Sequence, residues 1–444
     1  MPSRSFADFL APLAFVLALL LLALGYGFVA ARNELFPHAV LSQAEEAAHA
    51  FWKVYLAPEE RSAESYMLPA TGETGVMTAD PARMAPGVTF MTLYTAEGFE
   101  GRLVDEGGKV LQVWRAKPSE VFPGLPHLSW HVGDAVTAWH GAMLLPDGDI
   151  VFNFQEKSFP YGGGLVRLGK DSKVVWAVPR NTHHDVHLAD DGTFWVPSMH
   201  YRPNGLPGIP QLKPWYYEDT VLHVGNDGTV LGEISVLEAL KSYPGLLSLN
   251  YAEALEVKSN DPLHLNAAET LPAAWASAFP LFAPGDLLVS LRNINTIVVI
   301  DPGTGRAKWA LSGPFAKQHD PDFLPNGHIM LFDNRGGDPA CGGTRILELD
   351  PVSQKIVWSY DGCGGPPFDS GIRGVQQALP NGNVLVTETM RGRVFEVTRD
   401  SPARIVWDYR NALGEVEGQA RLGVVTHAER IPREALTFLP PPSS

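Results

Sequence analysis

The chain has 444 residues, of which 34 are Lys or Arg and 49 are Asp or Glu, so its formal charge is −15. A surface this acidic argues against a general nucleic-acid-binding protein, which needs a basic face to neutralise phosphates. Hydrophobic residues make up 45% of the chain, which is enough for a large core and excludes global disorder. The 43 glycines and 37 prolines indicate many turns and short elements rather than long helices.

The first predicted element is a run of 22 uncharged residues from Leu10 to Ala31. As a helix this run is about 33 Å long, which is enough to cross the hydrocarbon core of a bilayer. Arg4 precedes the run and favours an orientation in which the rest of the chain is exported. We expect residues 1–32 to be a signal-anchor helix in the inner membrane, with the remainder in the periplasm or outside the cell. A cleaved export signal is the alternative, because Val29-Ala30-Ala31 resembles a cleavage site.

The next segment, residues 33–100, contains one helical pattern and little else that is regular. Apolar residues recur about one turn apart between Leu41 and Leu56, which predicts an amphipathic helix. From Ala57 to about Glu100 the chain is rich in Pro, Gly and Thr, which indicates a linker or stalk.

After residue 100 a short β-type run that ends in tryptophan recurs. The interval from Trp309 to Trp358 is 49 residues, and the interval from Trp358 to Trp407 is also 49. The longer gap before Trp309 leaves room for a further copy, which GTVLGEI at residues 228–234 fits without the tryptophan. The copies with tryptophan end at Trp114, Trp176, Trp309, Trp358 and Trp407.

A second phrase alternates with the first and reads as a hairpin, because a turn signal separates two apolar runs. Together the two phrases describe about four strands in about 50 residues, repeated about six times. Such units bury their faces only against each other, so we expect an all-β fold, with residues 101–444 forming a six-bladed β-propeller. The final segment, Val424 to Pro432, is expected to share a blade with the partial first unit and close the ring. An open array of antiparallel sandwiches is the alternative. The hairpin phrases lie at 144–154, 188–197, 323–334 and 378–388, with an interrupted variant at 270–290.

Histidines occupy one register of this repeat. His140, His184 and His319 each stand six residues before the Pro, or its equivalent, of the turn phrase. The third copy has Asn266 at this position and His264 two residues earlier, on the same face of the strand. Any one of these histidines could be an ordinary hydrogen-bonding residue, but packing in a core would favour Val, Ile or Leu at the position. The inner strands of a propeller line its central channel, so the pattern predicts one shared functional site.

Arginines accompany the histidines. Arg292 and Arg335 each end the strand that follows a turn, and Arg373 precedes Gln376 in the fifth copy. The planar fork of donors in arginine suits tetrahedral oxyanions such as sulfate or phosphate. We therefore expect the histidines and arginines to form a pocket for a small anion.

A metal site is the rival interpretation, since HHDVH at residues 183–187 holds several ligand types at close spacing. Alternation along a strand places His184 on the opposite face from His183 and His187, so this strand alone does not complete a site. The two cysteines, Cys341 and Cys363, are too few for a disulfide framework or a zinc site built of cysteines. They are a disulfide candidate in an oxidising compartment, and two unpaired thiols otherwise.

The segments around the candidate site resemble the bacterial arylsulfotransferase (aryl-sulfate sulfotransferase) family. The resemblance covers roughly Trp139 to Tyr409 and is most specific between Leu263 and Asn334. It implies a six-bladed propeller exported to the periplasm that needs no cofactor. It also implies transfer of a sulfuryl group from a phenolic sulfate ester to another phenol, without 3′-phosphoadenosine phosphosulfate, by a ping-pong route through a sulfated histidine. The phrases that carry it are LHLNAAETLP at 263–272, GDLLVSLRNINTIVVIDPGTGRAKWALSGPF at 285–315, QHDPDFLPNGHIMLFDNRGG at 318–337 and GVQQALPNGNVLVTE at 374–388.

By position, the resemblance implies that His264, His319 and Arg335 surround the sulfuryl oxygens and the phenolic oxygen. We expect His140 and His184 to complete the wall of the catalytic site. Fixed cations and imidazole donors suit such a reaction, because sulfuryl transfer spreads charge over three oxygens. The candidate substrate-binding residues are Asn266, Arg292, Asn334, Arg373 and Gln376.

The chain departs from the family at one position of consequence. The family's transiently sulfated histidine lies on a late-blade strand, and no histidine occurs between His328 and His427 here. Another imidazole (His184, His140 or His187) takes the role, or this branch performs different chemistry, or it binds without turnover. The hypotheses are therefore an arylsulfotransferase-like enzyme, a non-catalytic ligand-binding propeller, and a metal-dependent hydrolase.

Overall fold

The computed structural model describes residues 6–33, 35–36, 66–70, 72–124, 133–155, 162–204, 215–243, 260–363 and 368–440. The chain forms two compact units, Met1–Ser62 and Ala63–Ser444. The amphipathic helix predicted at residues 41–56 lies outside the described residues.

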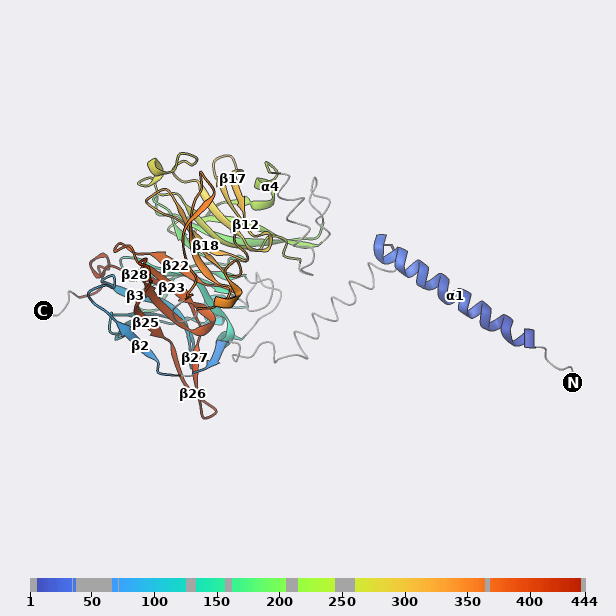
Figure 1. The fold of residues 1–444 in the computed structure, drawn as a ribbon, viewed down its shortest axis with the longest axis horizontal. Coiled ribbons are helices and arrows are strands. Elements are labelled where there is room, and N and C mark those ends of the chain that lie inside the picture. Colours follow the sequence, from blue (N-terminus) through green and yellow to red (C-terminus); the bar gives the residue numbers. More distant parts are fainter. Residues whose placement is uncertain are drawn as a thin grey trace. The chain divides into compact units, whose positions relative to one another are not determined.

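The first unit contains helix α1 (Phe6–Asn33), which includes Pro12 near its start (Figure 1). Its segment Pro12–Ala30 is long and apolar enough to cross a membrane. At 1.5 Å per residue these 19 residues span about 28 Å, close to the thickness of a bilayer core. Large side chains along it are exposed, with Leu24 at 75% and Phe28 at 67%. The helix is therefore compatible with a single-pass membrane anchor or a signal sequence.

The second unit is mostly β, as expected, and its described residues form six antiparallel sheets of four or five strands. We number the sheets in the order in which their innermost strands follow along the chain. Sheet 1 contains β6 (Ala138–Leu144), β7 (Ile150–Gln155), β8 (Gly162–Leu168) and β9 (Val174–Val178). Sheet 2 contains β10 (His187–Leu188), β11 (Phe194–Arg202), β12 (Tyr216–Val224) and β13 (Val230–Ser235). Sheet 3 contains β14 (Leu265–Thr270), β15 (Leu287–Leu291), β16 (Thr296–Asp301) and β17 (Arg306–Ser312).

The later sheets continue the same pattern. Sheet 4 contains β18 (His319–Phe323), β19 (Ile329–Asp333), β20 (Arg345–Asp350) and β21 (Lys355–Tyr360). Sheet 5 contains β22 (Val375–Ala378), β23 (Val384–Glu388), β24 (Arg393–Val397) and β25 (Ile405–Arg410), with β2 (Gly75–Ala79) added at its edge. Sheet 6 contains β28 (Val425–Ile431), β3 (Val88–Thr95), β4 (Gly98–Val104) and β5 (Val110–Trp114).

The remaining elements are short. A small sheet joins β1 (Met67–Pro69), β27 (Gln419–Gly423) and β26 (Ala412–Val416). Among its described residues the helices are α3 (Pro118–Val121) and α4 (Val236–Leu240), with single 3-10 turns η4 (Asp134–Val136), η5 (Ala276–Ala278), η6 (Arg292–Ile294), η7 (Pro339–Cys341), η8 (Thr389–Arg391) and η9 (Arg433–Ala435).

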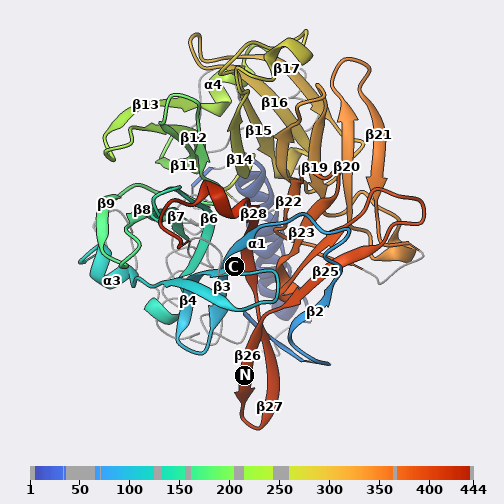
Figure 2. The ribbon, with the colours of Figure 1, turned by 90° about the vertical axis from the view of Figure 1, so that its left-hand side faces the viewer.

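The six sheets follow one another in a cycle. Figure 2 shows them fanning out around a common centre, near which β6, β14, β22 and β28 lie. The inner strands contact each other in the sequence β10, β14, β18, β22, β28 and β6. The cycle closes between β6 and β10, where Gly141 has a left-handed φ of 54° and packs directly against the backbone of His184 and Asp185. A separate apolar cluster fills each of the six interfaces between consecutive sheets, so the core is divided among the interfaces. The arrangement is propeller-like.

The C-terminal segment completes sheet 6, which holds the first strands of the repeat, as the sequence predicts. Strand β28 pairs with β3 in antiparallel register, with Ala428 opposite Met91 and Ile431 opposite Val88. Strands β1, β2 and β3 therefore lie within residues 33–100, which we expected to hold only a helix and a linker. The reason is that the repeat is permuted: β3 pairs with a strand from the far end of the chain, and local sequence periodicity does not reveal such a pairing.

Polar side chains on the inner strands link each sheet to the next. Oε2 of Glu269 accepts a hydrogen bond from the N–H of Phe323 (2.8 Å), which joins sheets 3 and 4. The side chain of Gln377 accepts from the N–H of Arg430 (2.7 Å) and donates to its carbonyl oxygen (3.1 Å), which joins sheets 5 and 6. Oε1 of Glu429 accepts from the N–H of Leu144 (2.9 Å), which joins sheets 6 and 1.

We expect replacement of Glu429 by glutamine to change how stability depends on pH. Burial raises the pKa of Glu429 from its ordinary 4.5 to about 7. The folded state thus holds the proton more tightly than the unfolded chain. The contribution of protonated Glu429 to the unfolding free energy is therefore full below about pH 4.5 and is lost as the pH rises through 7. When the pH is raised from 4.5 to 8, the unfolding free energy of wild type should fall by about 2 kcal/mol more than that of Glu429→Gln.

Denaturant unfolding at the two pH values measures this difference. Glu120→Gln is the matched control, since the Glu120 side chain is 67% exposed. If wild type and Glu429→Gln show the same pH dependence, Glu429 does not carry its proton in the folded state.

Candidate functional site

Four of the predicted histidines lie together at the starts of the inner strands, with His184 at their centre. The His184 ring lies 5.4 Å from the ring of His140, 5.0 Å from His264 and 6.5 Å from His319, measured between ring centroids. His183 is a fifth member, at 4.9 Å. The imidazoles of His140, His184, His264 and His319, which the repeat predicts to converge, come from four consecutive sheets and lie together here.

Irregular backbone brings these side chains inward. His184 and His264 have left-handed φ values of 62° and 57°, and Arg373 has one of 60°. Residues other than glycine rarely adopt this backbone conformation. Where they do, the surrounding structure maintains it, and such residues are often found at functional sites. Bulges interrupt strand pairing directly after His140 and directly after His319, and a bulge bends its strand locally.

Hydrogen bonds fix the tautomers of two of the rings. Nδ1 of His140 donates to the carbonyl oxygen of His184 (2.6 Å), and Nδ1 of His319 donates to Oδ1 of Asn334 (2.7 Å). Both acceptors are oxygens without a hydrogen, so Nδ1 carries the proton and Nε2 carries the lone pair. His264 is oriented differently, because its Nδ1 contacts the carboxylate of Asp261 at 2.5 Å.

The imidazoles of His140, His184 and His319 are neutral at neutral pH. Burial and, after it, the nearby charge of Arg292 lower the pKa of His319 to about 3. Burial also holds the pKa values of His140 and His184 well below the ordinary 6.5; Arg373 adds to the effect at His140, and the neighbouring imidazoles add to it at His184. A neutral imidazole with a fixed tautomer is suited to act as a nucleophile or as a general base.

Two of the three predicted arginines accompany the cluster. Arg292 and Arg373 are partly buried, and their charges act on His319 and His140 respectively. Arg335 is placed differently: its side chain is 53% exposed, lies over the backbone of Gly371, and is 3.8 Å from a carboxylate oxygen of Asp369. The role that the resemblance implies for Arg335 therefore stays a prediction, since within the described residues Arg335 pairs with Asp369 and not with the histidines.

The three predicted amide residues are already engaged by the protein. Asn334 is fully buried, accepts from His319 and donates to the carbonyl oxygen of Arg373 (2.5 Å), so it positions both residues. Asn266 donates to the carbonyl oxygen of Gln318 (2.8 Å). Gln376 donates to the carboxylate of Asp322 (2.9 Å). These contacts identify positioning roles, whereas direct contacts of these amides with a substrate stay predictions.

Sequence reasoning missed His427 on β28, whose Nε2 is buried without a hydrogen-bond partner and whose charge, when present, acts on His140. It stands five residues before Pro432 and not six, so it falls outside the register of the other histidines. A bulge between Val425 and His427 shifts the strand at this position. His427 is part of the closing phrase VVTHAERIP, but the sequence does not reveal the bulge that shifts this histidine out of register.

Cys341 and Cys363 are paired in a disulfide, with their Cα atoms 5.3 Å apart. The bond connects the loop that follows β19 with the segment that leads to β22, and these two segments carry Asn334 and Arg373. With Asp338 the two sulfurs also form a group close enough to hold a metal ion. Within the described residues no such group includes the clustered histidines. Because both cysteines are in the disulfide, their sulfurs are not thiolates available to a metal.

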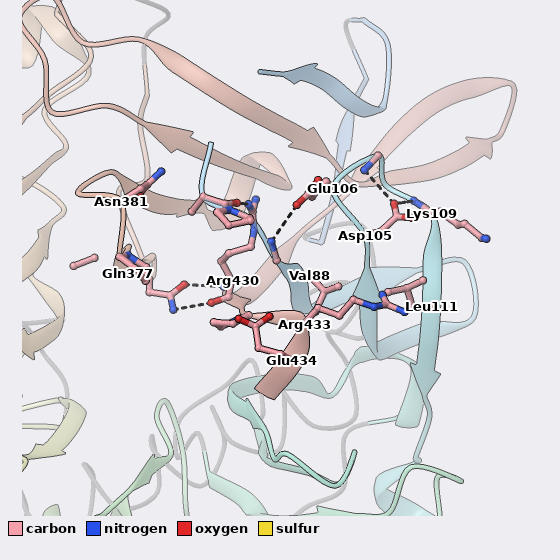
Figure 3. A pocket seen from close by; sticks show the side chains of 17 residues that line it. Val88, Asp105, Glu106, Lys109, Leu111, Gln377, Asn381, Arg430, Arg433 and Glu434 are labelled. Carbon is pink, nitrogen blue, oxygen red and sulfur yellow. Dashed lines mark hydrogen bonds between the residues drawn. The ribbon is translucent and has the colours of Figure 1, made fainter. Parts of the chain in front are cut away.

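A cleft of about 860 Å³ lies elsewhere, at the opposite ends of the inner strands (Figure 3). Gln377 and Arg430, near the ends of β22 and β28, line it together with Val88, Lys109 and Glu434. Arg430 is held in its wall by the two hydrogen bonds to Gln377 that Figure 3 marks. The clustered histidines take no part in this lining.

Fold and site together define a mostly β, propeller-like protein whose inner strands carry a buried cluster of imidazoles flanked by arginines. The model of the arylsulfotransferase (ASST) family matches residues 141–412. This match spans well over half of the chain and includes the clustered residues from His184 to Gln376, so the chain belongs to the arylsulfotransferase family. None of the curated proteins matches the chain.

The solved structures that are similar to this protein in backbone path share little sequence with it. A protein of unknown function from Bacteroides caccae has 12% identity and a TM-score of 0.47, with 78% of this chain and 98% of that chain covered. A streptogramin B lyase has 14% identity and a TM-score of 0.40, with 79% and 86% covered. A virginiamycin B lyase from Staphylococcus aureus has 11% identity and a TM-score of 0.40, with 81% and 98% covered.

Proposed function

We propose that this protein transfers a sulfuryl group between an aryl sulfate ester and a phenol at the histidine cluster. The observation that carries the proposal is the convergence of His140, His264 and His319 on His184. Core packing does not select four imidazoles from four successive sheets, whereas group transfer from a small anion requires nucleophiles and general bases, which imidazoles provide. Membership of the arylsulfotransferase family supports the reaction class.

The reaction fits the charges of the site. An imidazole Nε2 that carries a lone pair attacks the sulfur of the donor ester, and the N–S bond forms as the ester S–O bond breaks. The phenolate leaves with the electron pair of that bond. The acceptor phenol then attacks the same sulfur and gives its proton to a neighbouring neutral imidazole. The new S–O bond forms as the N–S bond breaks, the electron pair of that bond returns to Nε2, and the new sulfate ester leaves. Cations stabilise the charge that builds on the sulfuryl oxygens, and Arg292 and Arg373 lie closest to the imidazoles.

We further propose that the six sheets are the blades of a six-bladed propeller that spans residues 101–444 together with β2 and β3. The cycle of contacts between inner strands and the six interface clusters support this. Helix α1 would anchor the protein in the inner membrane with the propeller in the periplasm, and a disulfide is in keeping with an oxidising compartment.

The test is to incubate the full-length protein, purified in detergent, with 4-nitrophenyl sulfate and phenol. Release of nitrophenolate and formation of phenyl sulfate, both dependent on phenol, are expected. The double variant His184→Ala, His319→Ala provides the background rate. A wild-type rate equal to that of the double variant, with each acceptor phenol tried, would remove the proposal.

One observation favours a second candidate, an anion-binding protein without turnover. The inner strand β22 carries Gln376, whose amide is bound to Asp322, and no histidine. The family's sulfated histidine is expected on this strand. Saturable binding of 4-nitrophenyl sulfate with no release of nitrophenolate would distinguish this candidate from the enzyme.

A further inference from the structure

Arg373 differs from the other arginines near the cluster in having an unused donor. Its Nη1 is buried and makes no hydrogen bond, and no carboxylate in the described part of the chain forms an ion pair with it. A buried guanidinium N–H without a partner costs free energy, so such groups are rare unless a ligand or a water satisfies them. The vacant donor therefore points to a ligand that accepts hydrogen bonds.

The backbone of Arg373 is held in an unfavourable conformation by its surroundings. Its φ is 60°, and its carbonyl oxygen accepts a hydrogen bond from Nδ2 of Asn334 (2.5 Å). The next residue, Gly374, has a φ of 113°, and a Cβ there would lie 2.4 Å from the ring of Phe332. A left-handed non-glycine residue costs about 1–3 kcal/mol, so the network around it must maintain this conformation. In this conformation the charge of the guanidinium acts on the ring of His140.

The other two arginines lack this combination. Arg335 is half-exposed and lies beside Asp369, which offsets its charge. Arg292 donates from Nη1 to Oδ1 of Asn293 at 3.2 Å. Solvent and a neighbouring carboxylate weaken the attraction of an arginine for an anion, whereas Arg373 is partly buried and has no carboxylate partner within the described residues, so it keeps more of that attraction.

We infer that Arg373 is the oxyanion-binding arginine of the site, that it takes the oxygens of a sulfate-type group, and that Arg335 does not. Only the choice of sulfate as the ligand rests on the proposed function. Arginine presents a planar fork of donors that matches two oxygens of a tetrahedral anion. With the oxygens held there, the sulfur faces the lone pair on Nε2 of His140, which is itself buried and without a partner.

The test measures binding of inorganic sulfate to the full-length protein in detergent by titration calorimetry, at constant ionic strength set with sodium chloride. Arg373→Gln is expected to weaken sulfate binding at least about tenfold, which is the lower end for loss of a charged hydrogen bond. Arg373→Lys should recover part of the affinity, because it restores the charge without the fork. Arg335→Gln is the matched control and should change the affinity less than about twofold.

The inference is overturned if Arg335→Gln weakens binding as much as Arg373→Gln does, or if wild type shows no saturable binding of sulfate. Should Arg373→Gln not fold, sulfate binding is compared between Arg373→Lys and Arg335→Lys. The inference is then overturned if Arg335→Lys weakens binding as much as Arg373→Lys does. Binding does not require turnover, so the two proposals fail separately. Sulfate binding that depends on Arg373 in a protein without activity removes only the proposed function. Activity whose KM is unchanged in Arg373→Gln removes only this inference.

Discussion

Replacement of His319 by alanine is expected to lower kcat/KM for 4-nitrophenyl sulfate by about two to four orders of magnitude, the usual contribution of a positioned acid or base. The reason lies in the state of the ring. Its Nδ1 is committed to Oδ1 of Asn334, and burial keeps the ring neutral, so Nε2 has a lone pair at neutral pH. Without the imidazole no group at this position can accept the proton of the phenol.

His328→Ala is the control for this variant. His328 lies on the same sheet but is bound to Glu348 (2.6 Å) near the turn of the hairpin, away from the cluster. It should keep the rate of wild type within about twofold, as expected for a substitution outside the site. Similar losses in the two variants would show that sheet 4 was perturbed and that His319 has no special role.

A third variant, Asn334→Ala, separates positioning from chemistry. Asn334 holds the tautomer of His319 and the carbonyl oxygen of Arg373. Its loss should lower kcat while leaving the imidazole in place, and the remaining activity should follow a different pH profile because Nδ1 keeps only its longer hydrogen bond, to the carbonyl oxygen of Lys317 (3.1 Å).

The convergence of the histidines could be predicted because it depends on repetition. Once each unit is known to contribute an inner strand, residues at one register must meet at the axis whatever the details of packing. His140, His184 and His319 satisfy this rule, and the structure places them within one cluster. The same logic predicted that the last strand pairs with the first unit, since a cycle needs a partner for each edge.

The roles of the individual polar groups could not be predicted in this way. Whether Arg335 or Arg373 points inward depends on how the loops after β19 and before β22 fold against each other. Those loops are fixed by contacts between distant residues, such as Asn334 with Ser370 (2.5 Å) and Thr344 with Ser370 (3.0 Å), and by the disulfide. Spacing along the chain carries no information about such contacts. His427 was missed for a related reason, since one bulge moves a whole strand by one position.

A buried ion pair links sheet 5 to sheet 6, the sheet that contains the C-terminal strand β28. Arg430 on β28 is 4% exposed, and Glu396 on β24 is fully buried. Nη1 of Arg430 lies 3.4 Å from Oε2 of Glu396 and donates to the carbonyl oxygen of Ala85 (2.6 Å), and the guanidinium lies 4.8 Å from the ring of Trp407. Burial lowers the pKa of Arg430, and the charge of Glu396 opposes this shift.

Replacement of Arg430 by methionine is therefore expected to cost about 3–5 kcal/mol of unfolding free energy, because the carboxylate of Glu396 is left buried without a counter-charge. Its remaining partners, the N–H of Ala85 (2.7 Å) and the amides of Asn381 (3.1 Å) and Asn383 (2.7 Å), satisfy Oε1 but carry no charge. Equilibrium unfolding in denaturant measures the loss. Arg404→Met, at an exposed position, should change stability by no more than about 0.5 kcal/mol.

The double variant Arg430→Met, Glu396→Gln tests the cause of the loss. If the penalty arises from an unpaired buried charge, removal of that charge should return a large part of the stability, and the double variant should be more stable than Arg430→Met alone. If the double variant is the less stable of the two, Arg430 acts mainly through its hydrogen bonds to Ala85 and Thr89 and through its packing on Trp407. In that case the closing strand is held by shape and hydrogen bonding, and the ion pair contributes little.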